Sequence, residues 1–201
     1  MASSTLSAVD VRRLWPADMP LFRDHLIRLD SRSRHERFSG GMSDDFLIRY
    51  AQNCFGEGDL VFGGFIDGVM RGAAELRSSE AIWSEQAPFQ RHIHAEAAFS
   101  VEEPYRRRGV GETLFRRVEQ AASNHGVETV EIVCAPDNVP MIRLAGKFKT
   151  KFSFEENQIT GRLTASLPTA FSLLREASRD VMDLTASVFD ARTRDADLGA
   201  A

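Results

Sequence analysis

The chain has little of what a disulfide framework, a metal cluster or a membrane anchor would need. It holds two cysteines, Cys54 and Cys134, whose number and spacing match neither a ligand set nor a disulfide pattern, so we expect two buried thiols and no metal. It has no long apolar run and no signal-type segment, which predicts a soluble, cytoplasmic protein without a membrane partner. A formal net charge of -4 leaves no basic field over the whole chain, which argues against nucleic acid as the main partner.

No internal repeat or linker divides the 201 residues, and a hydrophobic content of 43% is enough for one substantial core. One α/β domain is the economical interpretation. We expect a flexible N-terminus over 1–8, the domain over 9–165, a helical extension of the same domain over 166–189 and a flexible polar tail over 190–201.

Apolar periodicity and turn residues predict the elements of this domain. The strongest local signal is Asp67-Gly68, which is typical of a tight hairpin turn. Two segments are expected to be irregular, the polar and basic 31–42 and the connector 78–88. The expected strands are Val9–Leu14, Leu60–Ile66, Val69–Leu76, Arg91–Val101, Thr129–Cys134, Lys151–Phe154 and Ile159–Ala165, with helices after Pro16, over Ser43–Phe55 and over Val110–Asn124.

A further helix is predicted from Pro168 to about Phe189. Its apolar side chains recur at helical spacing at Phe171, Leu174, Ala177, Val181, Leu184 and Val188. Such a face either packs on the domain or contacts a second copy, so a homodimer is one expectation.

The most informative stretch is Arg106-Arg107-Arg108-Gly109-Val110-Gly111, between a strand end and an amphipathic helix whose first turn includes Glu112. Glycines let the backbone turn sharply, and a helix N-terminus presents free N–H groups and positive dipole to an anion. Three arginines add charge, so the stretch favours a phosphorylated ligand. Alone, the hexapeptide could equally be a solvated turn, since it lacks both the Gly-Lys-Ser/Thr ending of a P-loop and the third glycine of a dinucleotide site.

In its context of strand, basic glycine turn, helix and strand, this stretch resembles the acetyl-CoA site of GNAT N-acetyltransferases. Asn138-Val139-Pro140-Met141-Ile142-Arg143-Leu144 resembles the family's next helix. The resemblance implies a mixed, mostly antiparallel twisted sheet of about seven strands flanked by helices. It also implies a pyrophosphate held by the amides from Arg106 through Gly111, a pantetheine arm along the helix of Asn138 and Met141, and a thioester carbonyl polarised by a backbone N–H at Phe99, Ser100 or Val101.

Leu144-Ala145-Gly146-Lys147-Phe148, with Ala95-Glu96-Ala97-Ala98-Phe99-Ser100-Val101, resembles the branch that contains the bacterial Pat-type protein lysine acetyltransferases. Many GNAT members carry a tyrosine at the position of Ala145, and that tyrosine protonates the departing thiolate. Without it, the thiolate would leave as the anion or take a proton from water. In the same branch a segment like Arg32–Phe38 lies beside the acceptor cleft, although here it could also be an ordinary loop.

Glu96 is the leading candidate for the general base. A carboxylate among Ala95, Ala97 and Ala98 would be partly desolvated, which makes it a stronger base; the matching glutamate is the base in Pat-like enzymes. The alternative is an outward strand residue paired with an arginine. Glu75 is the second candidate if the strands bring it beside Glu96, and otherwise a solvated strand-end charge. His92 and His94 share the face of Glu96 and rank third as a proton relay.

The sequence therefore predicts an acetyl-CoA-dependent N-acetyltransferase acting on a primary amine, either a protein lysine or a small polyamine or antibiotic. A second hypothesis is a non-catalytic acyl-CoA-binding sensor, which the alanine at position 145 keeps open and which Glu96 and Glu75 argue against. A third is an enzyme that uses a longer acyl group.

Overall fold

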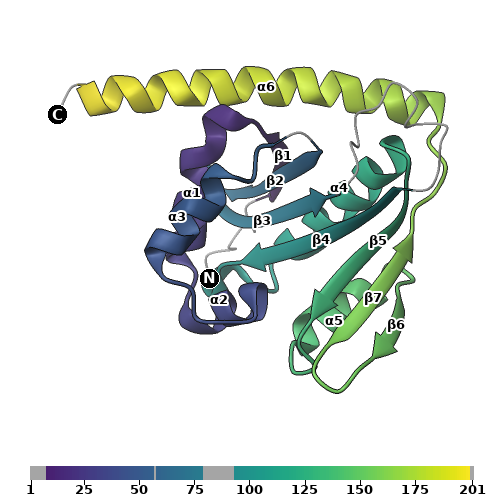
Figure 1. The fold of residues 1–201 in the computed structure, drawn as a ribbon. Helices are drawn as coiled ribbons and strands as arrows, with labels where there is room; N and C mark the ends of the chain where they lie inside the picture. Colours follow the sequence, from purple (N-terminus) through teal and green to yellow (C-terminus); the bar gives the residue numbers. More distant parts are fainter. Residues whose placement is uncertain (1–7, 57, 79–92, 200–201) are drawn as a thin grey trace, which may run out of the picture.

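The computed structural model describes residues 8–56, 58–78 and 93–199, and a seven-stranded sheet lies at its centre (Figure 1). The strand order is β1-β2-β3-β4-β5-β7-β6, and only the β4–β5 pair is parallel. The predicted mixed, mostly antiparallel sheet is therefore confirmed. The strands are β1 Asp10–Leu14, β2 Asp59–Ile66, β3 Val69–Arg77, β4 Ile93–Val101, β5 Val127–Cys134, β6 Lys151–Phe154 and β7 Ile159–Thr164.

The hairpin between β2 and β3 turns at the predicted Asp67-Gly68. Both residues have positive φ, +51° and +76°, as the two-residue turn that matches the twist of an antiparallel pair requires. The side chain of Asp67 tolerates this conformation better than most, and Gly68 adopts it without steric cost.

Helices cover both faces of the sheet and enclose two apolar clusters. On one face α1 (Met19–Arg28) and α3 (Asp44–Gln52) bury a cluster that includes Phe22, Leu47 and Phe65. On the other face α4 (Val110–Asn124) and α5 (Val139–Gly146) bury a cluster that includes Phe62, Phe115 and Ile132. Side chains alternate between these two faces along each strand.

The segment 31–42, expected to be irregular, contains a further helix, α2 (Ser31–Phe38). The prediction of a loop was wrong there because the helix carries almost no apolar face and is held by capping. The Asp30 carboxylate accepts from the Ser33 amide at 2.9 Å and from the Ser33 hydroxyl at 2.6 Å.

The C-terminal helix α6 (Ala170–Gly199) lies along one side of the molecule, against β1, the short 3₁₀ turn Pro16–Asp18 and α4 (Figure 1). The flexible tail expected over 190–201 is instead helical up to Gly199. The N-terminal residues before 8, His92 and the connector around Trp83 lie outside the described residues. Within the described ranges no helix is long and apolar enough to cross a membrane, and a cytoplasmic location stays a prediction.

Candidate active site

The strands β4 and β5 pair only along their first halves. The parallel ladder ends where Glu96 pairs with Glu131, after which β4 continues to Val101 and β5 to Cys134 without pairing (Figure 1). The Glu102 amide donates to Arg71 O of β3 at 3.0 Å. Successive amides along a strand point to alternate sides, so the Ser100 amide also points to β3, whereas the amides of Phe99 and Val101 point toward the opening. Two of the three predicted amides therefore face the opening, where free N–H groups can bind an extended ligand.

Beyond β4 the chain turns into α4 through residues with positive φ. Arg107 has φ +63° and Gly109, the N-cap of α4, has φ +87°. Within α4 the Thr113 amide is the first to donate, to Gly109 O at 2.9 Å. Within the described part of the chain, the amides of residues 109–112 donate to no backbone or side-chain acceptor. Four free N–H groups at a helix N-terminus form a site for an anion.

The three arginines of the motif differ in what they contact. Arg106 ties the turn to α2, donating from one guanidinium nitrogen to Ser33 Oγ at 2.9 Å and to Glu36 Oε2 at 3.1 Å, while its own amide donates to Glu103 O. Arg107 and Arg108 are exposed, and Arg108 lies over the Tyr105 ring at 5.2 Å from its centroid. Arg107 and Arg108 are thus the charges left to meet a ligand.

The α4 and α5 helices meet beside this turn. A Cβ at Gly111 would lie 3.3 Å from Leu144 Cδ2, so a larger residue would push the helices apart. Glu112 bridges them on the outside, accepting from Lys147 at 2.6 Å and Arg116 at 2.8 Å, and these hydrogen bonds hold the pKa of Glu112 below its usual value. The Glu112 carboxylate therefore links α4 to the end of α5 in this structure.

At the start of α5 the Asn138 side chain accepts from the Met141 amide at 3.1 Å, so Asn138 caps the helix. Met141 is half-buried against the core of this face. Ala145 lies deep in the same core with 1% of its surface exposed. This position offers no proton donor to a leaving group.

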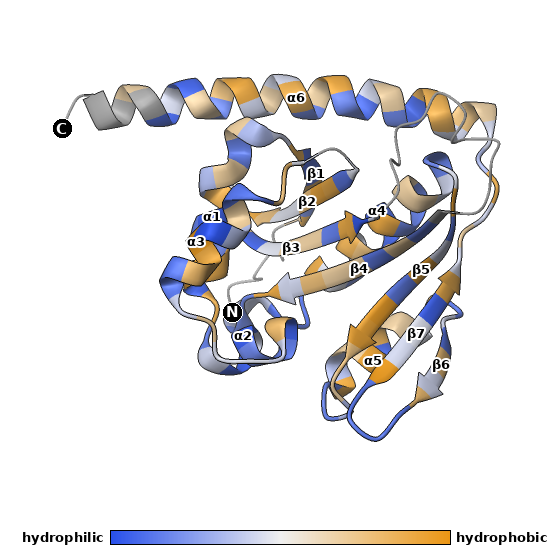
Figure 2. Ribbon diagram, viewed as in Figure 1, coloured by the Kyte–Doolittle hydropathy of each residue, from blue (hydrophilic) through white to orange (hydrophobic). Residues whose placement is uncertain are grey.

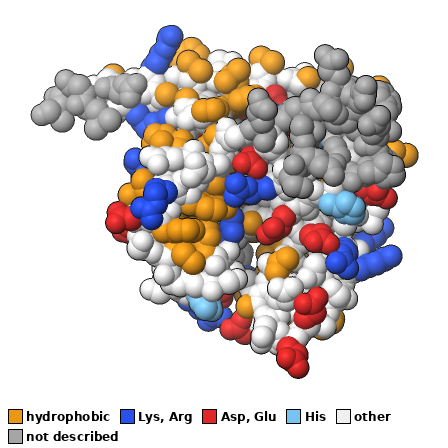
Figure 3. Space-filling view, in the orientation of Figure 1, with side chains coloured by type: hydrophobic (Ala, Val, Ile, Leu, Met, Phe, Trp, Pro, Cys, Tyr) orange, Lys and Arg blue, Asp and Glu red, His pale blue; other side chains and the backbone are white. Residues whose placement is uncertain are grey.

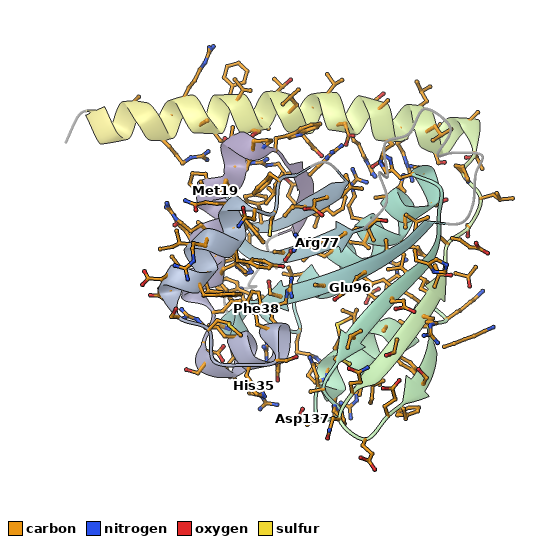
Figure 4. The ribbon with its side chains drawn as sticks, viewed as in Figure 1. Met19, His35, Phe38, Arg77, Glu96 and Asp137 are labelled. Atoms are coloured by element: carbon orange, nitrogen blue, oxygen red, sulfur yellow. The ribbon has the colours of Figure 1, made fainter. Side chains whose placement is uncertain are left out.

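Glu96 is exposed on the face of the sheet that carries α1–α3 (Figure 4). The desolvated setting expected for it was wrong, because Ala95 and Ala97 point to the opposite face. Its carboxylate has no hydrogen-bond or ion-pair partner among the described residues. The opposing Arg77 pairs instead with Asp59 at 3.2 Å, and the opposing Glu131 pairs with Arg162 at 2.7 Å. Within the described part of the chain, Glu96 is therefore an unpaired carboxylate at the position where β4 and β5 separate.

Glu75 lies opposite Ala98, further along the sheet, with 2% of its surface exposed. Arg37 donates to one carboxylate oxygen at 2.7 Å and the Tyr50 hydroxyl to the other at 2.6 Å, with Cys54 Sγ 3.6 Å away. Burial and the charge of Glu75 raise the pKa of Tyr50, and they raise that of Cys54 to about 12. The structure thus places Glu75 neither beside Glu96 nor in solvent, but in a closed network with a protonated phenol and thiol.

Aromatic side chains extend this network toward the surface. Phe38 of α2 packs edge-on against Tyr50 and Phe46 of α3, with ring centroids 5.1 and 5.9 Å apart. Arg77 donates to the Tyr50 hydroxyl at 3.3 Å and stands opposite Glu96, so the aromatic group and the free carboxylate lie on the same face (Figure 4). The aromatic end of α2 and Glu96 therefore lie on the same face of the sheet, and a role of the α2 segment in acceptor binding stays a prediction.

Sequence reasoning missed a buried chain of polar groups beneath β4. His25 Nε2 lies 2.9 Å from Ser100 Oγ and His25 Nδ1 lies 3.2 Å from Glu102 Oε1. Arg28 and Arg71 each donate to Glu102 at 2.9 Å. Burial lowers the pKa of His25. Burial alone would raise the pKa of Glu102, but the hydrogen bonds from His25 and Arg71 outweigh it and lower that pKa to about 2.

A neutral His25 that donates from Nδ1 to Glu102 accepts the Ser100 hydroxyl proton at Nε2. The Ser100 side chain therefore points to α1 and fixes the end of β4 against it. The two residues are 75 positions apart in the chain, so no local pattern could have predicted the contact.

Within the described residues no group of three histidine, cysteine or carboxylate side chains could hold a metal ion. Cys54 and Cys134 are both free and buried.

The sequence profile described as the acetyltransferase (GNAT) family matches residues 23–149. Solved structures with a similar fold include the GNAT domain of S. lividans PAT, at 17% identity and a TM-score of 0.63, covering 82% of this chain and 99% of that one. The E. coli ribosomal-protein-S18-alanine N-acetyltransferase is similar at 18% identity and a TM-score of 0.59, covering 81% of this chain and 97% of that one. YncA from Salmonella typhimurium, solved with acetyl-CoA, is similar at 14% identity and a TM-score of 0.56, covering 81% of this chain and 97% of that one.

Proposed function

The chain belongs to the acetyltransferase (GNAT) family, and on that premise we propose that it acetylates a primary amine, with a protein lysine as acceptor and Glu96 as general base. It is a GNAT-type N-acetyltransferase with acetyl-CoA as its donor substrate. The acceptor and the roles of individual residues are our proposal. The observation that carries it is the Glu96 carboxylate, unpaired among the described residues, at the last position where β4 pairs with β5.

The residues after β4 fit the diphosphate of the donor. Unused amides of residues 109–112 and the exposed Arg107 and Arg108 together present hydrogen-bond donors and positive charge at one helix N-terminus. The pantetheine arm would follow the unpaired edge of β4, beside Asn138 and Met141 of α5. The amides of Phe99 and Val101 that face the opening would orient the thioester and stabilise negative charge on its oxygen.

The incoming ammonium must lose a proton before its nitrogen can attack the thioester. Glu96 would accept that proton, and an exposed, unpaired carboxylate needs to break no ion pair to do so. The C–N bond then forms as the C–S bond breaks. The coenzyme A thiolate leaves as the anion or is protonated by water, since the alanine at position 145 supplies no acid.

A protein lysine suits the surface in front of Glu96. The exposed Glu96 carboxylate favours a cation, and the aromatic side chains of Phe38, Phe46 and Tyr50 offer apolar contact to the flanking chain. The same face would also admit a small polyamine. A non-catalytic sensor is the competing function, and the buried Ala145 is the observation that favours it.

The test is thiol release from acetyl-CoA by the wild type and by Glu96→Gln, against lysine peptides, polyamines and aminoglycosides. Loss of a general base costs typically a factor of about 10²–10⁴, so we expect kcat to fall by that much while calorimetric binding of coenzyme A stays unchanged. Glu131→Gln is the matched control, because it removes a neighbouring carboxylate that is already paired. Tight binding without turnover on any amine would favour the sensor, and equal kcat in wild type and Glu96→Gln would remove Glu96 from the mechanism.

A further inference from the structure

The α6 helix attaches to the domain through its acidic side. Glu176 accepts from Arg117 of α4 at 2.7 and 2.8 Å, Asp180 from Arg13 of β1 at 2.7 Å, and Asp190 from Arg12 at 2.9 Å. The side chains of Glu176, Arg117, Arg12 and Arg13 are nearly buried in these contacts. The spacing of 176, 180, 183, 187 and 190 puts this acidic side on one face of the helix.

The opposite side of α6 is apolar and faces away from the domain. Seven large apolar side chains on it are between 41 and 72% exposed: Phe171, Leu174, Val181, Met182, Leu184, Val188 and Phe189. Figure 2 shows apolar and polar residues alternating along α6, and Figure 3 shows apolar side chains gathered along it at the top of the view. A helix that packs on its own core has the reverse arrangement, and an exposed apolar patch of this length marks an interaction surface.

The exposed residues follow the spacing of a helix that packs against another helix. Positions 171, 174, 178, 181, 185 and 188 alternate steps of three and four, the repeat of a coiled-coil seam. Phe171, Leu174, Val181 and Val188 fill four of these positions, and the small Ser178 and Thr185 fill the other two. Met182, Leu184 and Phe189 flank the seam.

We propose that α6 pairs with α6 of a second copy of this chain, antiparallel, and that the protein is a dimer through this seam. A twofold axis between residues 179 and 180 places Phe171 against Val188 of the partner subunit, Leu174 against Thr185 of the partner subunit and Ser178 against Val181 of the partner subunit. Each contact occurs twice, as an isologous interface requires.

The antiparallel arrangement fits this sequence better than the parallel one. Parallel pairing would set Ser178 against Ser178 and Thr185 against Thr185, whereas antiparallel pairing gives each small polar residue an apolar partner. It also aligns the helix dipoles favourably.

The surface is large enough for a stable dimer. Taking roughly 150–200 Å² for each large side chain, the exposed parts of the seven residues amount to on the order of 600–800 Å² per copy. A standard interface buries about 800 Å² per partner. In Figure 1 β4 and β5 diverge toward the side of the molecule away from α6, so the pairing leaves the opening between them uncovered.

The first experiment measures the mass of the full chain in solution by sedimentation or light scattering. We expect the wild type to have twice the 22.4 kDa of one chain at micromolar concentration, and Leu174→Glu/Val181→Glu to have the mass of one chain with an unchanged circular dichroism spectrum. Phe154→Glu is the control, because Phe154 is 72% exposed on β6, outside the seam, and should remain dimeric. A monomeric wild type, or a double variant that stays dimeric, would overturn the proposal.

Cysteine cross-linking tests the orientation, and buried Cys54 and Cys134 leave the background low. In the antiparallel dimer the two copies of residue 171 are separated by about 17 helical residues, or about 26 Å. Phe171→Cys and Val188→Cys should therefore each fail to cross-link alone and should cross-link when the two variants are mixed. Rapid cross-linking of Phe171→Cys with itself would show the parallel arrangement instead.

Discussion

At the scale of single residues, the two candidate glutamates show how neighbours decide the role of a carboxylate. Glu75 and Glu96 lie on adjacent strands and on the same face of the sheet, yet Glu75 accepts from Arg37 and Tyr50 while Glu96 has no partner among the described residues. A buried carboxylate held by a guanidinium is a structural element, whereas an exposed free one can exchange a proton with a substrate. The sequence identified both glutamates but could not show which one the arginine of α2 would reach.

Replacing Glu75 should therefore lower the free energy of unfolding rather than kcat. Glu75→Gln leaves the Arg37 guanidinium buried without a counter-charge, and breaking a buried pair in this way typically costs about 3–5 kcal/mol of unfolding free energy. Urea denaturation measures the loss, with Glu131→Gln as the control. If stability were unchanged while kcat fell as far as in Glu96→Gln, Glu75 would be catalytic and our assignment would be wrong.

The His25–Glu102 pair predicts loss of stability in acid. Burial lowers the pKa of His25 in the folded protein, so the unfolded chain takes up a proton first as the pH falls below about 6.5, the ordinary value for histidine. Glu102, with a pKa of about 2 against the usual 4.5, adds stability that is present above pH 4.5 and is lost as the pH falls toward 2. Both groups therefore lower the free energy of unfolding as the pH falls.

We expect the unfolding free energy to decrease from pH 7 to pH 5, and to decrease less steeply in His25→Gln. The buried His125, whose pKa desolvation lowers to about 4, contributes with the same sign in every variant. His94→Gln, at an exposed position on β4, is the control. Equal slopes in wild type and His25→Gln would show that His25 is not the source.

At the scale of elements, the turn between β4 and α4 depends on one backbone conformation. Gly109 has φ +87°, and a Cβ there would meet nothing within 4 Å, so Gly109→Ala changes only the strain of that conformation. The strain costs about 1–2 kcal/mol, and relieving it would rotate the free amides of residues 109–112. We expect calorimetric binding of coenzyme A to weaken by about tenfold. At Gly146, which lacks positive φ, a Cβ would also meet nothing within 4 Å, so Gly146→Ala should bind coenzyme A as the wild type does. Equal affinity of Gly109→Ala and Gly146→Ala for coenzyme A would show that the turn does not contribute to donor binding.

The elements that the sequence predicted are those with strong local signals. Asp67-Gly68, the strand alternation of β4 and the glycines before α4 each specify a local conformation, and each was found where expected. The α2 helix was missed because its stability depends on an Asp30 cap and on contacts of Arg106 with Ser33 and Glu36, more than 65 residues away in the chain. The apolar face of α6 was predicted correctly as a pattern, but a periodicity cannot show whether a face points inward or outward.

At the scale of the whole molecule, α6 is joined to the domain by charge rather than by an apolar core. Arg12 and Arg13 of β1 and Arg117 of α4 pair with carboxylates at positions 190, 180 and 176 on the inner side of the helix. Buried ion pairs contribute little net stability compared with apolar packing, but they fix orientation, because any other rotation of the helix leaves a buried charge unpaired. In this interpretation the arginines determine that the apolar seam of α6 faces outward.

The pair of Arg117 and Glu176 tests this interpretation, since their side chains are 5 and 7% exposed and Asn124 donates to the same carboxylate at 3.2 Å. Arg117→Leu leaves Glu176 buried without its cation and should lower the unfolding free energy by about 3–5 kcal/mol. Arg117→Leu/Glu176→Leu removes both charges and should recover most of that loss, as thermal or urea denaturation would show. If the single variant lost less than about 1 kcal/mol, the pair would be too weak to orient α6, since isolated surface pairs contribute only about that much.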